Sequence, residues 1–209
     1  MDSTVIFDLG RVLVRIHDDA ILPSIAELTG TDVRSVTDLL AGVEEPFETG
    51  RIDTEEALTR VLEGASGAGG RDEAARGRRR RLLRAALGAR FTPIWPVVEL
   101  AYTLSARGYL LALASNTNPL DFDTVSRGYP DLLEPFGHRI FLSYRLGVMK
   151  PEPAFYSQVL AGLARPAEAC VFIDDREENV KAARRLGMRG IVYNGTEAPV
   201  ADLAALLGV

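Results

Sequence analysis

Cysteine and histidine are scarce in this sequence. The chain has one cysteine, Cys170, and two histidines, His17 and His138. A single cysteine excludes an internal disulfide framework and a cysteine-rich zinc or iron–sulfur site, and two histidines leave little for a histidine-based metal site. A metal held by carboxylate oxygens is still compatible with this composition.

Long apolar segments are also lacking in the 209 residues. No apolar run reaches the roughly 18 residues that span a bilayer. The first ten residues, MDSTVIFDLG, do not have the basic-then-apolar order of a secretory signal. We therefore expect a cytoplasmic protein with no membrane partner.

The chain has no excess of positive charge. Its 24 basic and 29 acidic residues give a net charge of −5, which does not favour a polyanionic partner. The arginine run at 78–81 lies in a helical pattern without aromatic residues, so we expect a solvated or acid-paired helix face there. We expect no nucleic-acid partner, and no feature indicates a required protein partner.

What the chain does have is the composition and pattern of an α/β protein. It is 47% hydrophobic and 25% charged, which is typical of a globular chain with a sizeable core. Short strand-like runs occupy residues 4–7, 109–114, 139–142, 170–173 and 190–193, and helical patterns occupy 95–107, 152–163 and 176–186. This alternation predicts a Rossmann-like parallel sheet with helices on both faces and a ligand site at the carboxyl ends of the strands.

About a hundred residues separate the first two predicted strands, which is far more than a crossover helix needs. Helical patterns at 19–28, 31–41, 54–62 and 72–87 predict an inserted helical cap with a loop at 64–70, and Thr31 and Asp53 or Thr54 are candidate N-caps. We therefore expect a core domain of residues 1–17 and 91–209, a cap domain of residues 18–90, and hinges near 15–18 and 90–93.

Polar residues follow the first two predicted strands. Asp8 comes directly after Val5–Phe7, and Ser115, Asn116 and Thr117 follow the strand that ends near residue 114. Strand ends of this kind hold ligands in parallel sheets, and hydroxyl and amide groups there suit oxyanion binding. Each set taken alone also fits a turn or a helix cap.

Charged residues follow the later strands. Lys150 lies in the proline-bearing segment GVMKPEP, Asp174 and Asp175 close an apolar strand, and Asn179 follows about one helical turn later. Adjacent carboxylates repel each other and favour a bound cation, and oxygen ligands of this kind suit Mg²⁺. The alternatives are a solvated lysine and an acidic helix start.

Four segments in order resemble the motifs of the haloacid dehalogenase superfamily. They are VIFDLGRVLV with Asp8, LASNTN with Ser115, LGVMKPEPAFY with Lys150 and VFIDDREENVKAARRLGM with Asp174 and Asp175. The inserted helices resemble the type 1 cap of that superfamily. Within it, the chain is most similar to bacterial phosphatases that act on α-D-glucose 1-phosphate.

The resemblance implies a hydrolase that transfers a phosphoryl group to Asp8 and then hydrolyses the aspartyl phosphate with water. It implies that Ser115 and Asn116, with Thr117 beside them, hold the phosphoryl oxygens and that Lys150 offsets their charge. The expected substrate is a small phosphate ester such as a sugar 1-phosphate.

The resemblance also implies a Mg²⁺ cofactor. Its expected ligands are the side chains of Asp8, Asp174 and Asp175 and the backbone carbonyl of Gly10, with Asn179 supporting them from behind. Without a cation, three carboxylates could not face a phosphate dianion.

Gly10 is a departure from the pattern, because most phosphatases of the superfamily have a proton-donating aspartate at that position. Losing a general acid lowers a rate by about 10²–10⁴-fold. Two solutions to the missing proton donor are open. The substrate could be an ester whose leaving oxygen tolerates negative charge, or the proton could come from His17, Asp18 or Asp19.

Two other functions are compatible with the sequence. One is a metal-independent 2-haloacid dehalogenase, against which the acidic pair speaks, and the other is a catalytically weakened phosphate-binding or interaction protein. For substrate selection we expect a loop at 45–51, between helices broken by proline and glycine, with Phe47 stacking on a ring and Arg51 meeting an anionic group.

Overall fold

A five-stranded parallel sheet forms the centre of the molecule. The computed structural model describes residues 3–65, 73–193, 195 and 205. The strand order is β5-β4-β1-β6-β7. Their bounds are Thr4–Phe7 for β1, Leu110–Ser115 for β4, Ile140–Leu142 for β5, Cys170–Asp174 for β6 and Arg189–Val192 for β7. The five predicted strands and their parallel arrangement are confirmed.

The register of the central strands aligns the predicted site residues. Phe7 of β1 pairs with Leu113 of β4 on one side and with Ile173 of β6 on the other. The N–H of Asp8 donates to the carbonyl of Ile173 at 2.9 Å. Parallel strands end at the same edge of a sheet, so the residues that follow these three strands lie together.

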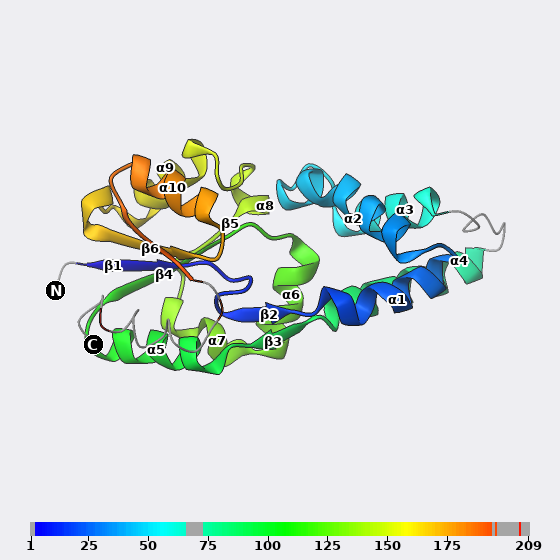
Figure 1. The fold of residues 1–209 in the computed structure, drawn as a ribbon, viewed down its shortest axis with the longest axis horizontal. Helices are drawn as coiled ribbons and strands as arrows, with labels where there is room; N and C mark the ends of the chain where they lie inside the picture. The colour runs from blue at the N-terminus through cyan, green and yellow to red at the C-terminus, as the bar shows by residue number, and fades with distance from the viewer. Residues whose placement is uncertain (1–2, 66–72, 194, 196–204, 206–209) are drawn as a thin grey trace.

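Helices cover both faces of the sheet (Figure 1). Val5 and Phe7 pack into one apolar cluster with α5 (Trp95–Ala106) and α6 (Pro119–Gly128), whereas Ile6 packs into another with α9 (Pro153–Leu163) and α10 (Glu177–Arg185). This alternation is the two-residue period of a strand buried on both faces. Shorter helical segments are α7 (Pro130–Leu133), α8 (Ser143–Leu146), η1 (Glu134–Phe136) and η2 (Ala167–Ala169).

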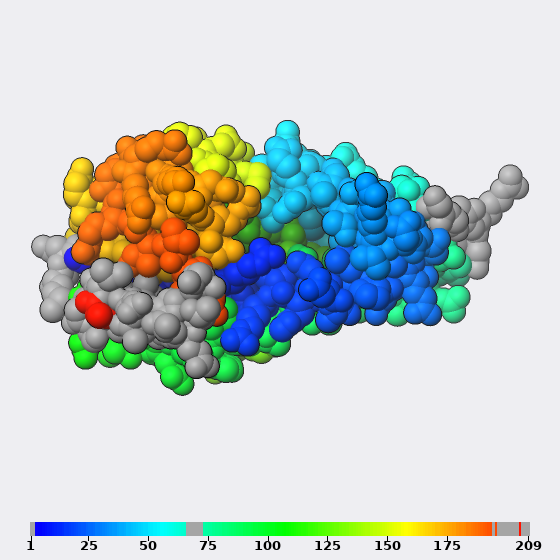
Figure 2. All heavy atoms as spheres, in the orientation of Figure 1, coloured from blue at the N-terminus to red at the C-terminus, as the bar shows by residue number. Residues whose placement is uncertain are grey.

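Four helices with their own apolar cluster lie between residues 18 and 88. They are α1 (Asp18–Thr29), α2 (Val33–Glu48), α3 (Thr54–Gly64) and α4 (Glu73–Gly88), and we call them the cap helices. They extend from one end of the sheet and form a separate lobe in the space-filling view (Figures 1 and 2). The exact division into a core of 1–17 and 91–209 and a cap of 18–90 stays a prediction.

A short antiparallel ribbon connects the cap helices to the sheet. It pairs β2 (Val14–Ile16) with β3 (Phe91–Pro93), next to the expected hinges. The N–H of His17 donates to the carbonyl of Arg90 at 2.8 Å. The two connections to the cap therefore leave the core side by side.

The structure corrects the sequence reading of α2. A break before residue 45 was expected, but the helix continues through Pro46 to Glu48. Val43 and Phe47, four positions apart, are both buried in the cap cluster, and this packing holds the last turn in place. Asp32 caps α2 instead of Thr31, whereas Asp53 caps α3 as predicted.

Three smaller expectations have mixed outcomes. Arg80 of the arginine run pairs with Glu55, which confirms an acid-paired face for part of the run, and Arg84 beyond the run pairs with the same glutamate. Most of the expected loop at 64–70 lies outside the described residues. Among the helices that the structure describes, none is long and apolar enough to cross a membrane.

Candidate active site

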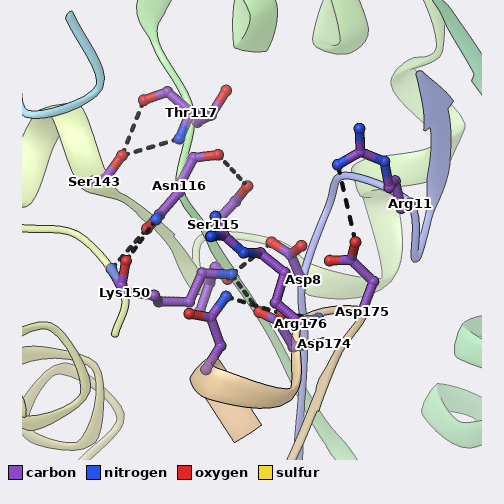
Figure 3. A network of polar contacts seen from close by, with 12 residues as sticks. Asp8, Arg11, Ser115, Asn116, Thr117, Ser143, Lys150, Asp174, Asp175 and Arg176 are labelled. Carbon is purple, nitrogen blue, oxygen red and sulfur yellow. Dashed lines mark hydrogen bonds and ion pairs between the residues drawn. The ribbon is translucent and has the colours of Figure 1, made fainter. Parts of the chain in front are cut away.

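The ammonium of Lys150 lies at the centre of a buried polar cluster (Figure 3). Its Nζ donates to Oδ1 of Asp8 at 2.7 Å, to Oδ2 of Asp174 at 2.7 Å and to the carbonyl of Ala114 at 3.0 Å. The lysine side chain is 1% exposed and that of Asp174 is fully buried. Groups at the carboxyl ends of β1, β4 and β6 are thus joined by one cation.

Electrostatics keep this lysine charged. Burial opposes the charged ammonium, but the carboxylates of Asp8 and Asp174 outweigh it and hold the pKa of Lys150 above its ordinary value. The three donors of an ammonium match the three acceptors around it. Lys150 is therefore a fixed cation at the end of β1.

Asn116 positions the lysine loop. Its Nδ2 donates to the carbonyl of Lys150 at 2.8 Å, and its Oδ1 accepts from the N–H of Lys150 at 2.7 Å. The sequence assigned Asn116 to the phosphoryl oxygens, but its carboxamide is occupied by these two bonds. Its backbone N–H is the group left for that role.

Ser115 and Thr117 line the same cavity as Asp8. Ser115 Oγ donates to the carbonyl of Asn116 at 3.1 Å. The N–H of Thr117 donates to Ser143 Oγ at 2.9 Å, and this hydroxyl donates back to the carbonyl of Thr117 at 3.0 Å. The segment after β4 is thus held rigidly beside Asp8.

The carboxylates of Asp8, Asp174 and Asp175 each offer an oxygen within 4.8 Å of the others. Lys150 pairs with two of these carboxylates, and the exposed Arg11 guanidinium lies 4.0 Å from the third, Asp175. Burial, the largest cause, and the charge of Asp174 raise the pKa of Asp8 to about 6, although Lys150 acts against them. Burial and Asp174 also raise the pKa of Asp175.

The donor set fits a hard divalent cation. All three side chains supply oxygen, which is the ligand type that Mg²⁺ prefers. Asn179 Nδ2 donates to Asp174 Oδ1 at 2.9 Å, while its own Oδ1 is buried without a hydrogen-bond partner among the described residues. A buried orphan acceptor beside the cluster is suited to a water molecule in the shell of an ion. Gly10 lines the same cavity.

Arg11 is a site residue that the sequence analysis missed. It adopts a left-handed backbone conformation with φ 57°, which is uncommon outside glycine. Its guanidinium lies 4.0 Å from Asp175 and 3.8 Å from Asp18. The Arg11 side chain is exposed, so no burial pattern in the sequence marks it as a site residue. Its position beside Gly10 was the one feature of the sequence that could have indicated this role.

Glu48 is the second residue that was missed. It ends α2 and lines the cavity of about 180 Å³ that also contains Asp8 and Lys150. Burial, followed by the charges of Glu44 and Asp121, raises the pKa of Glu48 to about 8. The expected loop at 45–51 contained this residue, but its contact with the cavity depends on how the cap sits over the sheet.

The two cap residues chosen from the sequence lie elsewhere. Phe47 is 6% exposed and lines an adjoining cavity of about 260 Å³ between the cap helices and α6. Arg51 pairs with Glu45 and donates from Nε to Thr49 Oγ1 at 3.1 Å, and it lines neither of the two cavities. The structure therefore does not bring Arg51 to Asp8.

Of the three candidate proton donors at the hinge, one lines the Asp8 cavity and two do not. His17 Nε2 lies 2.8 Å from Thr92 Oγ1 in an exposed contact, and it does not line the Asp8 cavity. Asp18 does line it and pairs with Arg90 at 3.0 Å, whereas Asp19 is exposed outside it.

Curated proteins that match the chain do so over part of its length. It is 34% identical over 119 residues to bifunctional epoxide hydrolase 2 of Sus scrofa, covering 55% of this chain. It is 39% identical over 66 residues to flavin mononucleotide hydrolase 1 of Arabidopsis thaliana, covering 32%, and 38% over 69 residues to a sesquiterpene phosphatase of Aspergillus oryzae, covering 33%. The chain spans between 21% and 35% of the lengths of these relatives.

A solved structure shares the fold over nearly the whole chain. An enzyme of the haloacid dehalogenase family from Bacteroides thetaiotaomicron, in complex with magnesium and inorganic phosphate, has a TM-score of 0.79 at 22% identity and covers 93% of this chain and 96% of its own. The family model for haloacid dehalogenase-like hydrolases matches residues 3–187. The chain therefore belongs to the haloacid dehalogenase-like hydrolase family.

Proposed function

We propose that the protein is a Mg²⁺-dependent phosphomonoester hydrolase that acts through an aspartyl phosphate on Asp8. The observation that carries this proposal is the bond of 2.7 Å between Lys150 Nζ and Asp8 Oδ1, inside a cluster with the carboxylates of Asp174 and Asp175. A carboxylate that is fixed by an ammonium and faces a cavity is arranged to receive a phosphoryl group.

The comparisons support this reaction class. Two relatives are named as a flavin mononucleotide hydrolase and a sesquiterpene phosphatase, and a structural neighbour holds magnesium and inorganic phosphate. A small phosphate ester is the common ligand chemistry. By analogy we assign the same class of substrate to this chain.

The proposed ion would be held by the carboxylates of Asp8, Asp174 and Asp175 and the carbonyl of Gly10. When bound, Mg²⁺ would neutralise charge on the phosphoryl oxygens. Asn179 orients one of these ligands, because its Nδ2 bonds to Asp174 at 2.9 Å.

The other groups of the chain perform the positioning. Asp8 attacks phosphorus with a carboxylate oxygen, while Lys150 holds that carboxylate and offsets the charge that develops. The hydroxyls of Ser115 and Thr117 and the backbone N–H of Asn116 hold the phosphoryl oxygens. Water then hydrolyses the aspartyl phosphate and restores Asp8.

If no other group replaces the proton donor that Gly10 lacks, the substrate needs a leaving oxygen that tolerates negative charge. A sugar 1-phosphate, the candidate from the sequence, has a leaving oxygen that tolerates negative charge and so needs less help from an acid. In that case the wild-type protein should hydrolyse glucose 1-phosphate faster than glucose 6-phosphate. Equal rates on the two isomers would remove the argument for a sugar 1-phosphate.

The same fold also hosts dehalogenases, which displace halide from carbon without a metal. The acidic cluster opposes this alternative, because the oxygens of its three carboxylates lie within 4.8 Å of one another and are the ligand type that Mg²⁺ prefers. Complete removal of divalent ions with EDTA should therefore abolish turnover, and addition of Mg²⁺ should restore it.

Release of inorganic phosphate tests the proposal. We expect turnover of phosphate esters with Mg²⁺, and a loss of at least about 10³-fold in Asp8→Asn, which cannot act as a nucleophile. A protein that binds vanadate with Mg²⁺ but releases no phosphate from any ester would instead be a phosphate-binding relative.

A further inference from the structure

An apolar chamber adjoins the cavity of Asp8. It has a volume of about 260 Å³ and lies between α1, α2, α3 and α6. Most of its lining is aliphatic or aromatic and comes from Leu22, Leu40, Phe47, Leu58, Val61 and Leu120. We call this space the leaving-group chamber.

The chamber and the Asp8 cavity share lining residues, and we call this shared border the neck. Both are lined by Asp18, Glu44, Glu48, Arg90 and Asp121. A phosphoryl group on Asp8 would lie in the cavity on one side of this neck, so the organic part of an ester could extend past the neck into the chamber. Apart from Thr37 and Asn118, the polar residues that line the chamber belong to the neck.

The lining discriminates between classes of alcohol. A sugar buries several hydroxyls, and each of them costs free energy unless it finds a hydrogen-bond partner. The polar groups of the chamber are concentrated at the neck, where Arg90 is already bound to Asp18 and Asp121. An alkyl chain has no such requirement and gains free energy from burial.

On the basis of the proposed phosphatase function, we propose that the leaving-group chamber binds an aliphatic alcohol, so that the substrate class is a monophosphate of a long apolar alcohol rather than of a sugar. The phosphate is held at Asp8 and the hydrocarbon lies against Leu40, Phe47 and Val61. Specificity then comes from hydrocarbon length.

A series of n-alkyl monophosphates from methyl to decyl tests this directly, with glucose 1-phosphate for comparison. Each buried methylene should raise kcat/KM by about fourfold until the chamber is full. The longer alkyl esters should exceed glucose 1-phosphate by at least about 100-fold. A kcat/KM that does not change with chain length would overturn the proposal.

Two variants of α2 localise the effect. Leu40→Gln places an amide in the chamber and should reduce the rise of kcat/KM with alkyl chain length. Leu39→Gln is the matched control, because Leu39 packs beside the cap cluster but does not line the chamber, and it should keep the wild-type dependence. An equal reduction in both variants would show that the chamber is not responsible.

Failure of this inference and failure of the phosphatase function give different results. Turnover of all esters without a chain-length effect, or a preference for glucose 1-phosphate, rejects the chamber and leaves the phosphatase intact. Absence of turnover on every ester, together with no phosphorylation of Asp8 by acetyl phosphate, rejects both.

Glu48 carries a second inference from a separate observation. Its partly exposed carboxyl lines the neck, past which the organic part of an ester could extend, and Gly10 has no side chain that could move a proton. His17 is bound to Thr92 outside the cavity, and Asp18 is paired with Arg90. Among the described residues, two carboxyls of the neck have no ion-pair partner, Glu44 and Glu48. Glu44 is exposed, so Glu48 is the partly buried one of the two.

We infer that Glu48 supplies the proton that the missing aspartate at position 10 would supply. Asp8 attacks phosphorus, the bond between phosphorus and the ester oxygen breaks, and that oxygen takes the proton of Glu48 and leaves as a neutral alcohol. The carboxylate of Glu48 then accepts a proton from the water that attacks the aspartyl phosphate. Inorganic phosphate is released, and Asp8 and Glu48 return to their starting states.

A series of aryl phosphates with leaving phenols of different acidity tests this role in single-turnover experiments. Wild-type rates should depend weakly on the acidity of the phenol. Glu48→Gln should show a steep dependence, with a loss of about 10²-fold or more for the least acidic phenols. Glu45→Gln, an exposed change on the same helix, should keep the weak dependence.

A structural role would lower all rates by the same factor, so an unchanged slope in Glu48→Gln overturns the inference. If Glu48→Gln does not fold, Glu48→Asp keeps the acid on a shorter side chain and should lower the rates of poor leaving groups more than those of good ones. If the wild type hydrolyses neither aryl nor alkyl phosphates and Asp8 is not phosphorylated by acetyl phosphate, the proposed function itself fails, and this inference with it.

Discussion

The ammonium of Lys150 lies 2.7 Å from Oδ1 of Asp8, although the two residues are 142 positions apart in the chain. This contact exists because β1 and β4 end at the same edge of the sheet, and the carboxamide of Asn116 draws the lysine loop to that edge. It joins the candidate nucleophile to its counter-charge in one rigid unit.

Removal of this cation should lower stability as well as activity. Lys150→Met leaves the buried carboxylates of Asp8 and Asp174 facing each other without compensation, so we expect a loss of about 3–5 kcal/mol in the free energy of unfolding. The double variant with Asp8→Asn should lose less than the sum of the single changes, because it removes the repulsion. Urea unfolding measures both quantities. A loss below about 1 kcal/mol in Lys150→Met would contradict the buried pairing.

Arg90 joins the cap connection to the core. It bonds to Asp18 at the start of α1 and to Asp121 on α6, which is buried. Arg90→Met should therefore destabilise the protein by about 3 kcal/mol, because it leaves the Asp121 carboxylate unpaired. Arg127→Met, which breaks an exposed pair with Asp123, is the control and should change stability by less than about 0.5 kcal/mol. Similar losses in both variants would show that Arg90 has no such role.

The rate of phosphate ester hydrolysis should fall as the pH rises above about 8. Burial raises the pKa of Glu48 from 4.5 to about 8, so the proton is present at pH 7 and is lost as the pH rises through about 8. The charged groups that influence Glu48 or share its cavity are Glu44, Asp121, Asp8, Asp18, Lys150, Arg90, Arg11, Asp175 and Arg176. A pH profile of single-turnover rates on an aryl phosphate with a poor leaving group should show this limb in the wild type and not in Glu48→Gln.

The raised pKa of Glu48 also makes the free energy of unfolding depend on pH. A carboxyl whose pKa is raised in the folded state binds its proton more tightly there, so its contribution to the free energy of unfolding is present below pH 4.5 and is lost as the pH rises to about 8. Urea unfolding at several pH values should therefore show a smaller loss of stability between pH 5 and 8 for Glu48→Gln than for the wild type. Parallel profiles would contradict the position of Glu48 in the structure.

Restoring the missing acid should partly replace Glu48. A Cβ at Gly10 would meet Ile16 Cδ1 at 3.2 Å, a flexible neighbour that can move by a few tenths of an ångström. We expect Gly10→Asp in the Glu48→Gln background to recover at least about tenfold of the rate on poor leaving groups. Rates on phosphates of acidic phenols should change little. No recovery in a folded variant would argue against proton transfer at the neck.

The sheet and the central cluster could be predicted from the sequence because local signals determine them. Buried apolar runs define the strands, and Asp8 and Asp174 come at the ends of two neighbouring ones. The ribbon of β2 and β3 was missed because each strand has three residues and its pairing partner lies far away in the chain. The role of Asn116 was misjudged in part, since no local pattern shows that its carboxamide binds the backbone of Lys150.

The cap was harder to predict for a physical reason. Pro46 usually ends a helix, but burial of Phe47 in the cap cluster overrides this preference. The presence of Glu48 in the Asp8 cavity, and the pairing of Arg51 with Glu45 instead, depend on how α2 is placed over the sheet. Tertiary placement of this kind leaves no periodic signal in a single sequence.

Identification of the phosphorylated residue tests the role of Asp8 as nucleophile. The protein is mixed with acetyl phosphate and Mg²⁺, quenched with acid within milliseconds and analysed by peptide mass spectrometry. We predict one phosphoryl group on Asp8, formed and lost at rates compatible with turnover and missing in Asp8→Asn. Turnover with no phosphorylated Asp8 at any time, or with the phosphoryl group on another residue, would show that Asp8 is not the nucleophile.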